Sequence, residues 1–248
     1  MRATASRYAP LLLLVLAWEL APRLGIANSS AFPPFSIVMH AWWYKLFLPG
    51  DLAVHGAASL FDLSAGLALS IAVGIALGLL MAWYRPIDAA VSPLIRALYP
   101  LPRSALIPVM ILWFGLGSGS KIASVFLGCL LPVVLSTYNG ARGVDLALIW
   151  SALAVGARRR AVLWQVVLPA AMPEILAGVR NALALSFILL VAAEFLVGRR
   201  GLGYLISFLG EGGVYDAMFA GVLTVAAVGF FADRLYLLFM TWMLRWRE

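Results

Sequence analysis

Six apolar runs constrain the fold of this chain more than any other feature. Most are close to the length that crosses a lipid bilayer, and the third is short unless the stretch Leu94–Arg103 extends it. They lie near residues 9–27, 59–83, 104–117, 121–138, 178–197 and 215–238. A helix needs about 20 apolar residues to cross roughly 30 Å of hydrocarbon, and a helix satisfies its own backbone hydrogen bonds there. The runs predict an all-α polytopic membrane protein with six transmembrane helices, forming a single domain over residues 1–248.

Composition supports lipid as the solvent of this chain. It is 64% hydrophobic and 12% charged, whereas soluble domains are roughly half apolar and about one quarter charged. The net charge of +7 comes from basic residues scattered in short clusters, so we do not expect nucleic acid as a partner. The lone cysteine, Cys129, excludes an intrachain disulfide and predicts a small core residue.

The basic residues predict the orientation of the chain. With a cytoplasmic N-terminus, the cytoplasmic side receives Arg2, Arg7, Arg85, Arg96, Arg103, Arg142, Arg158, Arg159, Arg160, Arg180, Arg234, Arg245 and Arg247, and the other side receives Arg23, Lys45, Lys121, Arg199 and Arg200. Cytoplasmic loops are enriched in Lys and Arg, so both termini are expected in the cytoplasm. A cleaved signal peptide ending near Gly25–Ala27 is the alternative for the first run, and it leaves the other five helices in the same orientation.

Small residues recur at every fourth position of the second run, at Gly66, Ser70, Gly74 and Gly78. This spacing places them on one helix face, where small side chains let a neighbouring helix approach closely. Tight packing within the bundle is favoured over a dimer interface.

The most informative segment is the predicted cytoplasmic loop, residues 139–178. Two short helices are expected, over 144–155 and 159–168, with a bend at Gly156 and a stop at Pro169. Leu163, Val166 and Val167 then share one face, an apolar stripe suited to a groove on a partner protein. The alternative is a helix lying on anionic lipid, because Arg158, Arg159 and Arg160 precede the stripe.

The loop resembles that of the binding-protein-dependent permeases of ATP-binding-cassette importers. Their pattern is Glu-Ala-Ala, three residues, Gly, nine residues, Ile-x-Leu-Pro, and the spacing is matched by Trp150-Ser151-Ala152, Gly156 and Val166-Val167-Leu168-Pro169. The resemblance implies that an ATPase-coupling loop contains Trp150, Ser151, Ala152, Gly156, Leu163, Val166, Leu168 and Pro169. Trp150 replaces the acidic first residue of the family, so any contact made by that carboxylate is lost.

Further motifs extend the resemblance over about residues 34–247 and point to the nitrate, sulfonate and taurine branch. They are Leu106-Ile107-Pro108, Leu112-Trp113-Phe114-Gly115, Tyr138-Asn139-Gly140, Arg142-Gly143-Val144-Asp145 and Gly201 to Ile206. The family implies a type I importer permease fold in a bacterial inner membrane, a second permease copy as homodimer partner, and surrounding lipid. It also implies an extracytoplasmic binding protein that delivers a sulfonate, taurine, nitrate or similar solute, and separate ATPase subunits that carry ATP and Mg²⁺.

The sequence offers no constellation for catalysis or metal binding. The stretch Gly115 to Lys121 has the wrong order for a phosphate-binding loop and reads as a turn, and His40 and His55 read as solvated surface residues. A gradient-driven transporter, which would need ionisable groups within the membrane, is one alternative, and a non-transporting membrane partner is another. Glu194 is the candidate such group, either as a structural or gating residue bonded to the backbone at Gly201–Tyr204 or as a contact for the solute.

Overall fold

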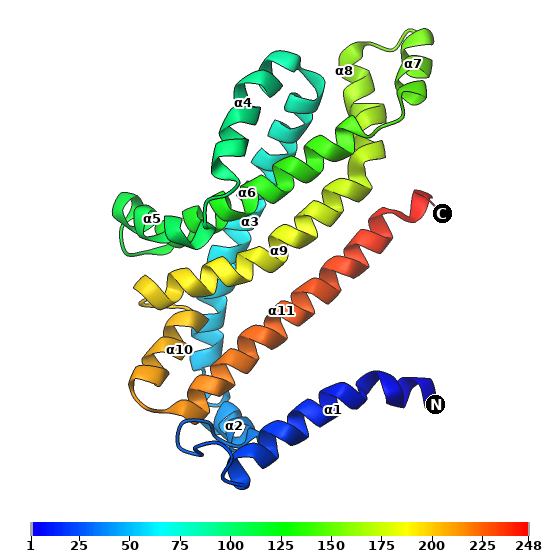
Figure 1. The fold of residues 1–248 in the computed structure, drawn as a ribbon. Helices are drawn as coiled ribbons and strands as arrows, with labels where there is room; N and C mark the ends of the chain where they lie inside the picture. The colour runs from blue at the N-terminus through cyan, green and yellow to red at the C-terminus, as the bar shows by residue number, and fades with distance from the viewer. Residues whose placement is uncertain (1, 248) are drawn as a thin grey trace. The chain divides into compact units, whose positions relative to one another are not determined.

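The structure is a computed structural model that describes residues 2–247, and all regular elements in that range are helices (Figure 1). It divides into two compact units, Met1–Ser59 with Gly198–Val228 and Leu60–Val197 with Gly229–Glu248. Two long helices, α3 (Asp51–Trp83) and α11 (Tyr215–Met243), contribute residues to both units. Residues 1 and 248 lie outside the described range. The membrane side of the termini stays a prediction.

The first unit contains α1 (Arg2–Arg23), α2 (Phe35–Ala41), the π-helical η1 (Trp42–Phe47) and α10 (Leu202–Glu211), with residues 51–59 of α3 and 215–228 of α11. Its core gathers Val38, Leu46, Leu205, Ala217 and Ala220. Two polar contacts tie η1 to α11: the Trp42 indole donates to Thr224 Oγ1 at 2.9 Å, and Lys45 pairs with Asp216 at 2.7 Å.

The second unit is built around α6 (Ser118–Arg142) and α9 (Leu168–Val197), which lie side by side (Figure 1). Its other elements are α4 (Arg85–Leu98), η2 (Arg103–Leu106), α5 (Ile107–Phe114), α7 (Leu146–Ala154), α8 (Arg159–Val162) and the π-helical η3 (Leu163–Val167). Cys129 lies fully buried between α6 and α9 and donates to the Ala182 carbonyl at 3.2 Å, so its prediction as a small core residue is confirmed.

Four helices are long and apolar enough to cross a membrane: α3, α6, the continuous helix Arg159–Leu196 and α11. They contain the second, fourth, fifth and sixth predicted runs. A fifth span is possible if the bent pair Arg85–Leu98 and Arg103–Phe114 counts as one. The first predicted run lies largely within α1, which carries Arg7, Glu19 and Arg23. The count of six therefore stays a prediction.

The third predicted run differs most from the structure. Instead of one helix over residues 104–117, α4 is followed by a 97° bend, then by η2 and the short α5. Pro100 and Pro102 lie at the bend, and neither has an N–H to continue a helix. The bend carries η2 against α6 and α9. Arg103, predicted on the cytoplasmic side, thus packs among membrane-spanning helices.

The small-residue face of α3 packs within the bundle, as predicted. A Cβ on Gly74 would meet Val133 side-chain atoms at 2.7 and 2.8 Å, and one on Gly78 would meet Thr137 Cβ at 2.6 Å. Ser70 Oγ donates both to Gly66 O at 2.9 Å and to Phe126 O at 2.8 Å. Since Val133, Thr137 and Phe126 belong to α6, this face lets α3 and α6 approach at backbone distance.

Gly74→Ala is expected to lower the thermal midpoint of the purified protein by several degrees, because the added methyl group cannot fit without moving α3 from Val133. The matched control is Gly56→Ala in the same helix, where a Cβ would meet nothing within 4 Å. Alanine stabilises a helix by up to about 1 kcal/mol relative to glycine, so the control should match or exceed the parent midpoint. Equal midpoints for the two variants would contradict the close approach.

Candidate functional site

The predicted coupling loop begins with a well-capped helix and a glycine turn. Asp145 Oδ1 accepts from the Ala147 N–H at 2.8 Å and so caps the first turn of α7. Gly156 ends the helix with a φ of +87°, which is unfavourable for residues with a side chain. The Gly156 N–H donates to Leu153 O at 3.0 Å, and the Ala157 N–H to Ala152 O at 3.1 Å. The predicted bend at Gly156 is therefore confirmed.

The second predicted helix does not stop at Pro169, and that expectation was wrong. From Arg159 the chain runs as one helix through α8, η3 and α9 as far as Leu196. Proline has no N–H to bond to the preceding turn, and Pro169 is the second residue of α9, which follows the wider π-helical turn at Leu163–Val167. The membrane-spanning helix thus extends without interruption to the Gly156 turn.

The apolar stripe was predicted to face a partner, and the structure contradicts this. Leu163 and Val167 are 4% and 1% exposed and belong to the core of the second unit, and Val166 packs against that core. Leu168 is partly buried in the same way. The exposed apolar side chains of the loop are instead Leu146, Leu148, Trp150, Val155 and Trp164.

Helix α7 has one face on the core of its own unit and one face free. Ile149, Ala152 and Leu153 pack against the core cluster, whereas Trp150 is 65% exposed and Val155 86%. Ser151 is also exposed, next to Trp150. The free face of α7 is therefore apolar at Trp150, and the buried face packs α7 against the core of the second unit.

Glu194 lies in a buried cluster of charges that the sequence did not reveal. Its carboxylate is 3.7 Å from the Lys121 ammonium, which is also 3.2 Å from Asp62 Oδ2. The side chains are 0%, 7% and 1% exposed, respectively. Lys121, predicted to lie at the outer surface, is thus a core residue. The cluster joins α6, α9 and α3, and within it one positive charge faces two negative ones.

Asp62 is held in this cluster by charge more than by hydrogen bonds. Within the described residues, neither of its carboxylate oxygens has a hydrogen-bond partner, because the Lys121 ammonium is near Oδ2 without being aligned as a donor. Coulomb attraction depends on distance and not on alignment, so we regard the pair as an ion pair. Neither charge is near bulk solvent, and each therefore depends on the other for compensation.

The start of α10 is held by side chains of α3. The Gly201 N–H donates to His55 Nδ1 at 3.1 Å, and the Leu202 N–H to Ser59 Oγ at 2.8 Å. The reading of His55 as a solvated surface residue was wrong, since it supports the start of α10. The predicted bond between Glu194 and the backbone at Gly201–Tyr204 stays a prediction.

Comparison with known proteins places these features in a family. The model of the family described as "Binding-protein-dependent transport system inner membrane component" matches residues 74–245. A Bacillus subtilis permease named for aliphatic sulfonates transport, SsuC, is 31% identical and covers 95% of this chain and 85% of its own. The taurine transport system permease protein TauC of Escherichia coli is 36% identical over 75% of this chain and 68% of its own.

A third relative and the solved structures extend the comparison. The formylaminopyrimidine transport permease protein ThiX of Halalkalibacterium halodurans is 35% identical over 78% of this chain and 76% of its own. Among solved structures, a chain of the inward-facing MetNI methionine ABC transporter has a TM-score of 0.64 and 17% identity, covering 77% of this chain and 97% of its own. That similarity shows a shared type I permease fold.

Proposed function

Since the chain belongs to the family of binding-protein-dependent inner-membrane components, the permease subunits of ATP-binding-cassette importers, we propose that it forms the path for a small anionic solute and couples through α7. Membership makes the chain a transport subunit and not an enzyme. It also sets aside the gradient-driven and non-transporting alternatives. ATP hydrolysis takes place on a separate subunit, and a binding protein delivers the solute.

The free face of α7 is the surface that contacts the ATPase in this proposal. Its support is the exposure of Trp150 and Val155 on a short helix whose other face is packed on the core. A helix attached in this way moves with the membrane-spanning helices, so closure of two ATPase subunits on ATP and Mg²⁺ is transmitted to the path. Trp150 supplies apolar contact area where related permeases supply a carboxylate.

The assembly in this proposal is a homodimer in the inner membrane with both termini in the cytoplasm. One chain with so few spanning helices does not readily enclose a gated path for a polar solute, and two-fold assemblies are the commonest. Lipid covers the remaining apolar faces, such as that of α11 with Phe231 and Leu235 exposed.

Glu194 acts in this proposal as a structural residue and not as a solute contact. Its side chain is fully buried and paired with Lys121, so no surface is left for a solute in this conformation. The cluster is formed by Asp62 of α3, Lys121 of α6 and Glu194 of α9. These residues lie near the helix ends that are expected to face outside, and they fix the three helices to one another. The cluster thereby sets the geometry of the outer end of the path.

The solute is proposed to be a sulfonate, taurine, nitrate or a similar anion. The relatives SsuC and TauC are named for sulfonates and taurine, whereas ThiX is named for a formylaminopyrimidine, which is not of that class. The sequence motifs shared with the nitrate, sulfonate and taurine branch favour an anionic solute over a formylaminopyrimidine.

Affinity purification of the tagged chain in mild detergent, followed by mass spectrometry and an ATPase assay, tests the function. We expect an ATPase to co-purify and its activity to rise several-fold when the loaded binding protein is added. A matched purification of Trp150→Asp, which restores an acidic residue on the free face of α7, should retain the ATPase. Reproducible absence of any ATPase from membranes that express its gene would refute the proposal.

A further inference from the structure

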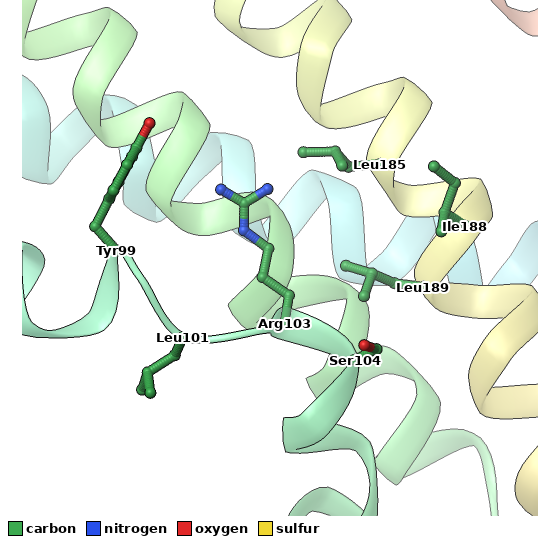
Figure 2. A pocket seen from close by; sticks show the side chains of 7 residues that line it. All are labelled: Tyr99, Leu101, Arg103, Ser104, Leu185, Ile188 and Leu189. Atoms are coloured by element: carbon green, nitrogen blue, oxygen red, sulfur yellow. The ribbon is translucent and has the colours of Figure 1, made fainter.

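Arg103 projects from the bend between α4 and α5 into a hollow among membrane-spanning helices. The hollow has a volume of about 330 Å³ and is lined by Tyr99, Leu101, Arg103, Ser104, Leu185, Ile188 and Leu189. In Figure 2 the Arg103 side chain extends into the space between Tyr99 on one side and Leu185 on the other. The lining is apolar apart from the guanidinium and the hydroxyl groups of Ser104 and Tyr99.

The hollow lies at mid-depth of the spanning helices. Arg103 also lines a second hollow with Leu130, and Leu130 is close to the middle of α6, Ser118–Arg142. On the other side, Leu185 belongs to the interior of the Arg159–Leu196 span. A helix broken at mid-membrane, with polar groups at the break, is the arrangement by which many transporters bind their solutes.

The Arg103 charge has no ion-pair partner among the residues that the structure describes. None of the ion pairs in the described part of the structure involves it, and the side chain is partly buried. Charges within a membrane are costly and in most cases pair with another charge or face a water-filled cavity. An arginine that is neither paired nor at the membrane border is therefore a candidate for binding an anion from outside the chain.

The second hollow adds an apolar compartment to this site. Its volume is about 190 Å³, and apart from Arg103 it is lined by Leu98, Leu101, Leu106, Val109, Met110, Trp113, Leu127, Leu130 and Leu131. Arg103 and Leu101 belong to both hollows. A guanidinium at the junction of an open hollow and an apolar one fits a ligand with an anionic head and an apolar tail.

We propose that Arg103 and Ser104 form an intramembrane site for the anionic group of the solute, and that the hollow along Val109, Met110 and Leu130 takes its apolar part. The guanidinium offers planar paired N–H donors that match the oxygens of a sulfonate or carboxylate, and the Ser104 hydroxyl adds a donor. The proposal rests on the proposed function and narrows its solute class to organic anions, in preference to nitrate.

Uptake of radiolabelled ethanesulfonate, hexanesulfonate and nitrate by proteoliposomes that hold permease, ATPase and binding protein tests the site. Arg103→Gln is expected to reduce sulfonate uptake at least tenfold, and Arg103→Lys is expected to reduce it less. The control is Arg96→Gln in α4, which removes a charge from the same bent pair without lining either hollow. It should transport normally.

Filling the apolar hollow tests its role separately from the role of Arg103. Val109→Trp is expected to reduce hexanesulfonate uptake several-fold more than ethanesulfonate uptake. Sulfonate uptake by Arg103→Gln at the parent rate would overturn the site. Transport by the parent protein of nitrate or uncharged solutes only would overturn it as well. The importer function would stand in each case. Loss of ATPase stimulation in the parent assembly would instead refute the proposed function.

Discussion

Gly156→Pro is expected to reduce solute uptake at least tenfold while leaving the chain folded and in the membrane. Proline fixes φ near −65°, whereas Gly156 has a φ of +87°. The substitution also removes the N–H that donates to Leu153 O at 3.0 Å. The turn between α7 and the Arg159–Leu196 helix must therefore adopt another path, and the free face of α7 changes direction.

The fold should tolerate this change because the turn is at the surface. A Cβ on Gly156 would meet nothing within 4 Å, so the strain stays local. The matched control is Gly213→Pro, at another surface glycine of positive φ with open surroundings but far along the chain from α7. Uptake, co-purification of the ATPase and membrane level are measured for both variants. Normal uptake by Gly156→Pro at normal level would exclude α7 as the coupling element.

The loop shows how far helical periodicity predicts a binding surface. The spacing of Leu163, Val166 and Val167 correctly identified a buried face, but the same pattern results whether the face is covered by a partner or by the chain's own core. The structure assigns it to the core. Trp150, which departs from the family pattern, lies on the free face of α7. No signal within the loop distinguishes these two cases.

Charged residues show a second limit of prediction from the sequence. Apolar runs locate spans by their length, and charged residues mark where each run ends. A charged residue that lies within the membrane interrupts a run in the same way, so the sequence pattern assigns it to the membrane surface. Arg103 and Lys121 were both assigned to the membrane surface for this reason. In the structure, Arg103 lies beside the middle of α6 and Lys121 is only 7% exposed. Their contacts come from helices distant in sequence, which no local pattern encodes.

Lys121→Met is expected to destabilise the protein more than any other single change considered. It removes the ammonium that faces the buried carboxylates of both Asp62 and Glu194. Removing one partner of a buried ion pair costs about 3–5 kcal/mol. Membrane levels should fall severalfold, and the thermal midpoint in detergent should fall by ten degrees or more. Asp62→Asn should cost much less, because Lys121 then still pairs with Glu194, 3.7 Å away.

The double variant Lys121→Met/Asp62→Asn distinguishes charge balance from packing. The parent cluster has two carboxylates and one ammonium, so its net charge is that of one carboxylate. The double variant has the same net charge, because only the Glu194 carboxylate remains. The double variant should therefore be more stable than Lys121→Met alone. If the two sites were independent, the second substitution would instead lower the stability further. Thermal midpoints of the parent, both single variants and the double variant give the coupling energy directly. Additive losses would mean that Lys121 and Asp62 do not interact. The attachment of α3 to α6 at these two residues would then need another explanation.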